Sequence, residues 1–342
     1  MAQHALDGVG LAYPRVIGLP LLYAAGVEAS ERANLPRWNG QPGHYEIWFF
    51  VIFHPTERQA WWLRFTTFSP RQGGSNLAIV WAAAFGGARP VVARTVAHAD
   101  DSYRAAVDRF DVEIGSSRLW HGGARGESHG LAWDLSFAPA PAPHESEPLL
   151  LRSLPLPVHV AHVHQRVQFR GSVTVDGSIV ALDGAPGVQK HIWGHRRVES
   201  LAWLYCPDFE GEPAAMLEAT SVALRAGRPP QLTFFSTAQG GAPHRRGGLW
   251  SAVRSRVVKT GPYELTFFGR DIEARAWAEP ETLVGYTYRD PAGWDVYVAQ
   301  SDVASCDARI DGRRLRNRGR AALEFHGLEP LPSIEYLPWQ SV

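Results

Sequence analysis

Two neighbouring segments, residues 44–53 and 59–68, constrain the fold of this chain more than any others. The first reads His-Tyr-Glu-Ile-Trp-Phe-Phe-Val-Ile-Phe and is almost wholly apolar and aromatic. The second reads Gln-Ala-Trp-Trp-Leu-Arg-Phe-Thr-Thr-Phe and follows a short turn at 55–58. Aromatic and β-branched residues are enriched in strands, and a short turn between two such runs joins antiparallel neighbours. The pattern predicts a β-hairpin.

Strand-like runs recur along most of the chain at a spacing of about 8–14 residues, as is typical of an all-β protein. They are parted by turns at glycine, proline and aspartate; the clearest turns are Asp176-Gly177 and residues 290–293. The chain has 13 Trp, 10 Tyr and 15 Phe beside 33 Gly and 25 Pro. This composition favours strands around an interior of large rings. The strands suffice for two barrels of about eight each, a size that encloses one small ligand.

The alternating Ala-Pro run at 138–143 interrupts this pattern and favours an extended linker. We therefore predict a lead-in at 1–42, with one short helix near 21–32. A first β domain follows at 43–150, and a second at 151–342.

Charge and cysteine content exclude several classes of protein. The 34 basic and 34 acidic residues cancel, so we expect no nucleic-acid partner. Cys206 and Cys306 alone give no disulfide framework, which suits a reducing compartment. We find neither a signal-peptide pattern nor an apolar run of about 18 residues, and we expect a cytoplasmic protein. No phosphate loop, nucleophile elbow or dinucleotide motif is present, so we expect no cofactor.

Residues 187–208 hold the densest group of chemically able side chains. His191, Trp193 and His195 share one face of an extended segment because side chains alternate along a strand. Such a face can hold a proton donor beside an aromatic surface. The structural alternative, in which these histidines bond to backbone carbonyls, is equally compatible with the sequence.

A metal site is a further interpretation of this stretch. Three more histidines, His159, His162 and His164, precede the stretch and could add imidazole ligands. However, His159 faces the opposite way to the other two on a strand, and neither an HExxH helix nor a cysteine pair is present. We therefore expect no metal.

Two carboxylates fall inside apolar runs, where a charge must be paired, solvated or protonated. Glu46 shares a face with Trp48 in the first strand. It is either an acid or anchoring acceptor in a cavity, or a buried partner for Arg64 across the hairpin, and the second interpretation is slightly favoured. Glu218 lies in the apolar run Ala-Ala-Met-Leu-Glu-Ala-Thr, so it too is either an acid or acceptor in a cavity or a buried structural partner.

Five short motifs occur in a familiar order over residues 43–326. They are Tyr-Glu-Ile-Trp-Phe-Phe at 45–50, Trp-Asp-Leu-Ser-Phe at 133–137, His-Ile-Trp-Gly at 191–194, Tyr-Arg-Asp-Pro at 288–291 and Ala-Leu-Glu at 322–324. The sequence resembles the lipocalin-like superfamily that groups carotenoid 1,2-hydratase (hydroxyneurosporene synthase), AttH-type proteins and several Diels–Alderases. The resemblance implies an all-β fold of two tandem lipocalin-like, calycin-type antiparallel β-barrel domains packed together, with an apolar pocket and no redox cofactor.

The resemblance also implies two kinds of chemistry. The hydratases protonate an isoprenoid double bond and add water, and aromatic rings stabilise the cation. The Diels–Alderases fold a polyene into a reactive shape. His191 and Trp193 match the family motif. The Tyr-x-Asp acid of the hydratases has no counterpart at the expected place, since Glu218 occupies roughly that region and Tyr205 and Asp208 come earlier.

The leading hypothesis is a cofactor-independent hydratase or cyclase-type enzyme for a hydrophobic isoprenoid, polyene or polyketide-like substrate. The candidate catalytic residues are His191, Glu218 and Tyr205. The candidate substrate-binding residues are Trp193, Trp48, Glu46, Trp203 and Asp208. A non-enzymatic carrier of a hydrophobic ligand is the alternative, and a structural or stress protein without a ligand is a third. A transient membrane-surface contact and the oligomeric state stay open.

Overall fold

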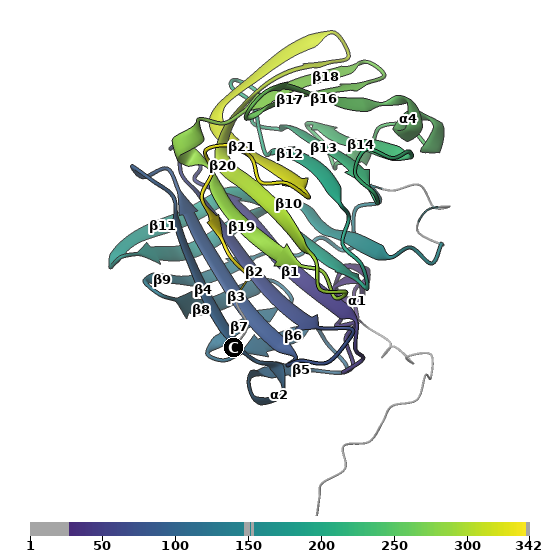
Figure 1. The fold of residues 1–342 in the computed structure, drawn as a ribbon. Helices are drawn as coiled ribbons and strands as arrows, with labels where there is room; N and C mark the ends of the chain where they lie inside the picture. The colour runs from purple at the N-terminus through teal and green to yellow at the C-terminus, as the bar shows by residue number, and fades with distance from the viewer. Residues whose placement is uncertain (1–26, 147–150, 152–153, 340–342) are drawn as a thin grey trace, which may run out of the picture.

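The protein is described by a computed structural model that covers residues 27–146, 151 and 154–339. Most of it is antiparallel β-structure in two 11-stranded sheets (Figure 1). The first sheet contains β1 (His44–Phe53), β2 (Ala60–Ser69), β3 (Leu77–Phe85), β4 (Val91–His98), β5 (Tyr103–Ala105), β6 (Asp111–Ile114), β7 (Ser117–Trp120), β8 (Gly123–Ser128), β9 (Leu131–Phe137), β10 (Val158–Val175) and β11 (Ser178–Gly194). The second contains β12 (Ser200–Cys206), β13 (Ala215–Ala223), β14 (Gln231–Gln239), β15 (His244–Arg245), β16 (Arg256–Gly261), β17 (Glu264–Gly269), β18 (Ile272–Trp277), β19 (Val284–Arg289), β20 (Asp295–Ile310), β21 (Arg313–Gly327) and β22 (Tyr336–Leu337).

Helices are short and peripheral in the described residues: α1 (Ala29–Asn34), α2 (Ala99–Ser102), α4 (Leu249–Arg254) and the 3-10 turn η1 (Pro280–Thr282). Helix α1 overlaps the end of the helix predicted near 21–32, and residues 1–26 lie outside the described part. No helix in that part is long and apolar enough to span a bilayer.

The first sheet is built outward from the predicted hairpin. β1 pairs with β2 in the expected antiparallel register, and its other edge pairs with β11. The order β4-β3-β2-β1-β11-β10-β9-β8-β7-β6-β5 then curls the sheet toward closure. The hydroxyls of Thr95 on β4 and Ser128 on β8 lie 3.0 Å apart across the curl. The all-β fold predicted from the sequence is confirmed.

The chain passes from one sheet to the other between Gly194 and Ser200, not at residue 150. β10 and β11 both extend the first sheet and form a long hairpin. Its turn is the predicted Asp176-Gly177 pair, whose φ angles of 46° and 82° match a tight hairpin turn. Proline has no backbone N–H to donate to a strand ladder, so the Ala-Pro run at 138–143 interrupts strand pairing. The strands on either side of it, β9 and β10, both belong to the first sheet, so the run does not separate the two sheets.

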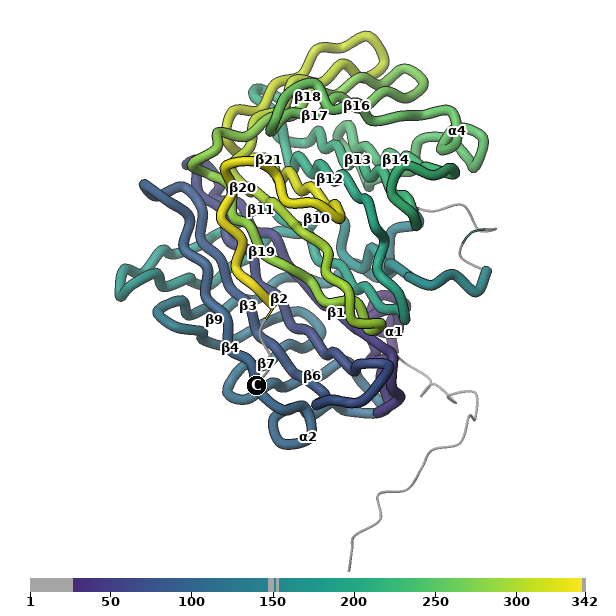
Figure 2. The backbone as a smooth tube through the Cα atoms, in the orientation of Figure 1, coloured from purple at the N-terminus to yellow at the C-terminus, as the bar shows by residue number. Residues whose placement is uncertain are grey.

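β1, β2 and β3 are buried along their whole length, which explains why their sequences do not alternate with polar residues. On β1, Trp48 and Phe50 enter the core inside the first sheet, while Ile47 and Phe49 face the second sheet. β19 and β20 lie across this outer face (Figure 2). The rings of Trp62 and Tyr286 stack there at 5.4 Å. β1 is thus a wall shared by two cores.

Candidate functional site

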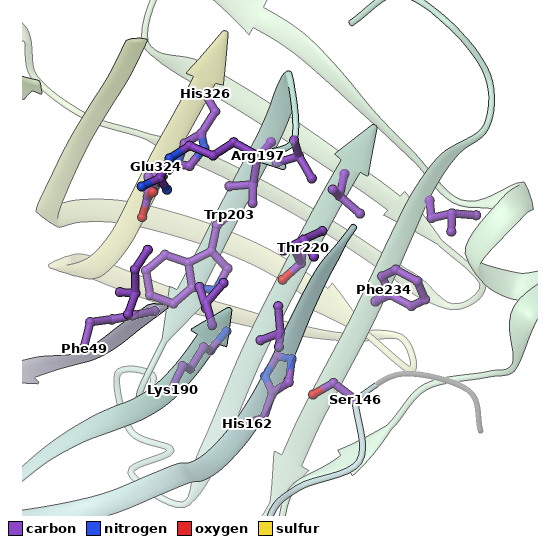
Figure 3. Close-up of a pocket in the computed structure, with 18 of the residues that line it drawn as sticks. Phe49, Ser146, His162, Lys190, Arg197, Trp203, Thr220, Phe234, Glu324 and His326 are labelled. Carbon is purple, nitrogen blue, oxygen red and sulfur yellow. Dashed lines mark hydrogen bonds and ion pairs between the residues drawn. The ribbon is translucent and has the colours of Figure 1, made fainter. Parts of the chain in front are cut away.

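A cavity of about 330 Å³ lies between the two sheets. One wall comes from β1 and β11, and the other comes from β12, β13 and β14. Figure 3 shows Phe49 and Phe234 on opposite sides of it. Further apolar side chains that line it are Tyr45, Ile47, Ile192, Leu201, Val222 and Leu232. Apolar walls of this kind suit a hydrophobic small molecule.

Glu218 in the middle of β13 brings a buried carboxylate into this cavity. Its Oε1 accepts a 2.7 Å hydrogen bond from Trp203 Nε1 and pairs with Lys190 Nζ. Its Oε2 accepts a hydrogen bond from Gln165 Nε2 and lies 3.4 Å from His162 Nδ1. Both oxygens therefore have partners, as a buried charge requires.

Irregular pairing of β10 delivers two of these partners to one place. His162 and Gln165 are three residues apart, so a regular strand would point them to opposite faces. The β10–β11 register shifts on both sides of His164, at bulges or irregularities of the kind that re-aim side chains. Nδ1 of His162 lies 3.1 Å from Oε1 of Gln165, and both residues reach Glu218.

A second polar group lies elsewhere on the cavity wall. The guanidinium carbons of Arg64 and Arg197 lie 3.9 and 4.5 Å from the centroid of the Tyr288 ring. Burial lowers the pKa of Arg64 to about 9 and also lowers the pKa of Arg197. Glu324 pairs with His326 beside them.

The two polar groups are separated along the cavity. In Figure 3, Arg197, Glu324 and His326 lie toward one end, and Lys190 and His162 lie toward the other. The Trp203 ring stands between them. The cavity therefore combines an apolar middle with a distinct polar group toward each end.

The structure does not place His191, a predicted catalytic residue, at this cavity. Its ring is fully buried inside the first sheet, where Nδ1 lies 2.8 Å from the Ala33 carbonyl oxygen and Nε2 lies 2.7 Å from Glu46 Oε1. The ring stacks on Trp48 at 4.9 Å. His191 alternates with Lys190 and Ile192, so it faces away from the cavity that they line.

Glu46 and Trp48 lie in the same interior cluster and not at the cavity. Glu46 is fully buried and accepts hydrogen bonds from the backbone amides of Arg37 (2.7 Å) and Trp38 (2.9 Å). Its predicted pairing with Arg64 is wrong, because Arg64 lies opposite Phe49 in the hairpin and faces the cavity. Glu46 anchors the segment before β1.

Trp193 shares the His191 face and likewise does not line the cavity. Its ring lies 4.6 Å from the His191 ring and stacks on His159 at 5.5 Å. The Arg37 guanidinium covers it at 5.2 Å. These contacts make Trp193 a packing residue near the rim of the first sheet.

The remaining predicted residues lie on β12 or just after it, and only one of them lines the cavity. Trp203 lines the cavity, and its role in substrate binding stays a prediction. Tyr205 is fully buried and donates a 2.9 Å hydrogen bond to the Gln165 carbonyl oxygen, and burial raises its pKa. Asp208, just beyond β12, pairs with Arg320 away from the cavity.

The three histidines at 159, 162 and 164, which could add metal ligands by sequence, are dispersed. His164 Nδ1 accepts a 3.1 Å hydrogen bond from the Ala140 amide, His159 stacks on Trp193, and His162 joins the Glu218 cluster. No three or more His, Cys, Asp or Glu side chains gather to hold a metal ion anywhere in the described ranges.

The sequence interpretation missed Lys190, Gln165 and Arg64 as site residues. A signal for Lys190 was present, because it is one of only two lysines and lies inside a strand rich in apolar residues. Gln165 gave no comparable signal, since its orientation depends on the irregular β10 register.

Known proteins match this chain over most of its length. No protein-family model matches the sequence. An uncharacterized protein of Mycobacterium tuberculosis, found in strains CDC 1551 and H37Rv, is 26% identical over 295 residues, which cover 85% of this chain and 88% of that protein.

Three solved structures share the fold at low sequence identity. An AttH-like protein of Nitrosomonas europaea has a TM-score of 0.57 at 12% identity and covers 84% of this chain and 93% of its own. Kievitone hydratase of Nectria haematococca has 0.51 at 11%, covering 82% and 88%. CghA, solved with Sch210972, has 0.52 at 12%, covering 88% and 93%. The chain thus has the lipocalin-like fold of the AttH-like and hydratase structures, and the resemblance drawn from its sequence motifs is confirmed at that level.

Proposed function

We propose that the protein is a hydratase or cyclase-type enzyme that needs no cofactor and acts on a hydrophobic isoprenoid, polyene or polyketide-like molecule between its two sheets. One observation carries the proposal: a buried carboxylate, Glu218, stands in a mostly apolar cavity with a lysine and a histidine beside it. Keeping a charge there is costly, and such groups are characteristic of sites that move protons. A hydratase among the proteins of the same fold supports the reaction class.

In a hydration, Glu218 would exchange protons with the ligand. Addition of water places a proton on one carbon of a double bond and the water oxygen on the other, and the attacking water then loses its second proton. The Glu218 carboxylate first takes a proton from the neighbouring Lys190 ammonium and donates it to the carbon; it then accepts the proton that the attacking water loses and returns it to Lys190, so the cluster ends the cycle unchanged. Lys190 and His162 offset the change of charge, and the apolar walls exclude bulk water.

In a cyclisation, the same cavity acts mainly by shape. Phe49, Phe234 and the Trp203 ring would hold a flexible chain in one folded conformation. The entropy of folding the ligand is then lost on binding and not in the transition state. A carrier would need only the apolar walls, so the Glu218 cluster favours an enzyme over a carrier.

The test starts from the ligand that co-purifies with the protein, identified by mass spectrometry. That compound is incubated with the protein, and its products are examined for a gain of one water or for an isomer. Glu218→Gln is expected to abolish turnover and leave ligand affinity nearly unchanged. Glu113→Gln, on the exposed side of β6, is the matched control and should retain full turnover. Turnover that survives in Glu218→Gln contradicts the assignment, and binding without any product identifies a carrier.

A further inference from the structure

Arg64 and Arg197 place two buried guanidinium groups on the cavity wall. Their exposed fractions are only 3% and 6%. In the ranges that the structure describes, neither guanidinium forms an ion pair with a carboxylate. Glu218 is already paired with Lys190, and Glu324 with His326. A buried charge without a counter-ion in contact is costly, so these two groups call for an explanation.

Both arginines also keep hydrogen-bond donors unused. Arg64 Nε is buried without a partner. Arg197 donates from Nε to the Arg289 carbonyl oxygen at 2.9 Å, which fixes its position, but its Nη2 is buried without a partner. Both side chains line the cavity. A guanidinium that is held in place with unused donors is preorganised to bind an acceptor.

Each guanidinium contacts aromatic rings, and the nearest carboxylates act on it only through space; Asp290 is one of them, and its Oδ2 accepts a 2.6 Å hydrogen bond from the backbone amide of Arg197. Arg64 lies over the Tyr288 ring, and Arg197 lies over the rings of Tyr45 (4.2 Å) and Tyr288 (4.5 Å). Cation–π contacts attract a guanidinium but leave its charge in place. Burial lowers the pKa of both arginines, and Glu324 opposes this for Arg64 and Asp290 for Arg197; in the described residues neither carboxylate lies within ion-pair distance of a guanidinium. Both guanidinium groups therefore keep their charge and have a donor that no group of the described residues accepts.

We propose that Arg64 and Arg197 bind the carboxylate of the ligand, so that the substrate is an apolar molecule with an ionised carboxyl group. This inference rests on the proposed function, because it fills the same cavity and narrows its substrate class. The planar fork of a guanidinium matches the two oxygens of a carboxylate. From this anchor the apolar body would extend past Trp203 toward Lys190, the partner of Glu218 (Figure 3). The carboxylate then anchors the substrate, and the reacting carbon lies near Glu218.

Decanoate and 1-decanol, which share an apolar chain but differ in charge, serve as probes for calorimetric titration at pH 7. Decanoate is expected to bind about tenfold or more tightly than decanol, because a charge-assisted contact replaces a neutral one. Arg64→Gln and Arg197→Gln should each remove most of this difference. Arg125→Gln, on the exposed side of β8, should retain it. Equal affinity for the two probes in the unaltered protein overturns the inference without need of any variant.

Thermal unfolding provides a second readout that a structural role would not give. Removing an uncompensated buried charge in Arg64→Met should raise the melting temperature of the unliganded protein. Decanoate should raise the melting temperature of the unaltered protein and leave that of Arg64→Met nearly unchanged. A lower melting temperature in Arg64→Met with an unchanged decanoate response would mean that Arg64 is structural. Glu218→Gln should keep the preference for decanoate, so failure of the anion site and failure of the proton-transfer role are distinguishable.

Discussion

Lys190 and His191 are consecutive residues of β11, yet their side chains enter two different cores. Lys190 faces the second sheet and pairs with Glu218 in the cavity. His191 faces the interior of the first sheet, where its Nε2 lies 2.7 Å from Glu46. The strand is buried on both sides at this point, so alternation divides one sequence motif between a candidate site and a structural core.

His191→Ala is expected to reduce stability and not catalysis. The substitution removes a buried ring that stacks on Trp48, and it leaves the Glu46 carboxylate with one fewer partner. We expect the free energy of unfolding to fall by about 2 to 4 kcal/mol, as measured by urea denaturation. Turnover per folded molecule should stay near the unaltered value. A large loss of turnover in a protein of normal stability would return His191 to the active site.

Lys190 and Glu218 should show strong coupling in a double-mutant cycle. Lys190→Met leaves the Glu218 carboxylate buried without its cation and should destabilise the protein by about 3 kcal/mol or more. The double variant Lys190→Met/Glu218→Gln removes both charges, so it should be less destabilised than the sum of the two single variants. Chemical denaturation of all four proteins measures the coupling. Additive effects would show that the two groups do not depend on each other.

Asp302 should make stability depend on pH in the neutral range. It is fully buried, and burial raises its pKa to about 8 even though Gln300 Nε2 donates a 2.8 Å hydrogen bond to it. The folded state therefore holds a proton that the unfolded state releases above about pH 4. Its contribution to stability is fully present below that pH and is lost as pH rises through about 8.

The Asp302→Asn variant tests this assignment. The amide keeps an oxygen that can accept the Gln300 hydrogen bond and cannot ionise. At pH 8 the variant should be more stable than the unaltered protein by about 1 to 3 kcal/mol, and the difference should shrink toward pH 4. Melting temperatures across this range give the comparison. Parallel pH profiles for the two proteins would contradict the raised pKa.

Gly194, the last residue of the His-Ile-Trp-Gly motif, should tolerate no side chain. A Cβ atom there would lie 2.3 Å from the Pro157 carbonyl oxygen and 3.0 Å from Val158 Cα. These are backbone atoms, which cannot move aside as a flexible side chain can. Gly194→Ala should therefore lower the free energy of unfolding by about 2 kcal/mol or more. Gly184→Ala, at a site with no neighbouring atom within 4 Å, is the control for steric contact; its φ of 71° predicts a separate and smaller backbone cost. An alanine at 194 as well tolerated as that at 184 would contradict the close approach.

The fold was largely predictable because it depends on local signals. The hairpin at 44–68 was predicted by its aromatic strands, and the Asp176-Gly177 turn by its chemistry, and both are confirmed. The passage between the sheets was not predictable in the same way. It lies at 194–200, where the sequence carries no proline-rich or flexible signal, whereas the prominent Ala-Pro run falls within the first sheet.

The sequence by itself determined that the chain forms strands, where its tightest turns lie and that Glu218 is an acid in an apolar run. Only the tertiary structure decided which face of each strand meets the cavity. Alternation fixes that His191 and Lys190 point opposite ways, but the partner sheet fixes which direction is the core and which is the cavity. The partners of Glu218 come from β10, β11 and β12, and such long-range contacts leave no mark in local sequence.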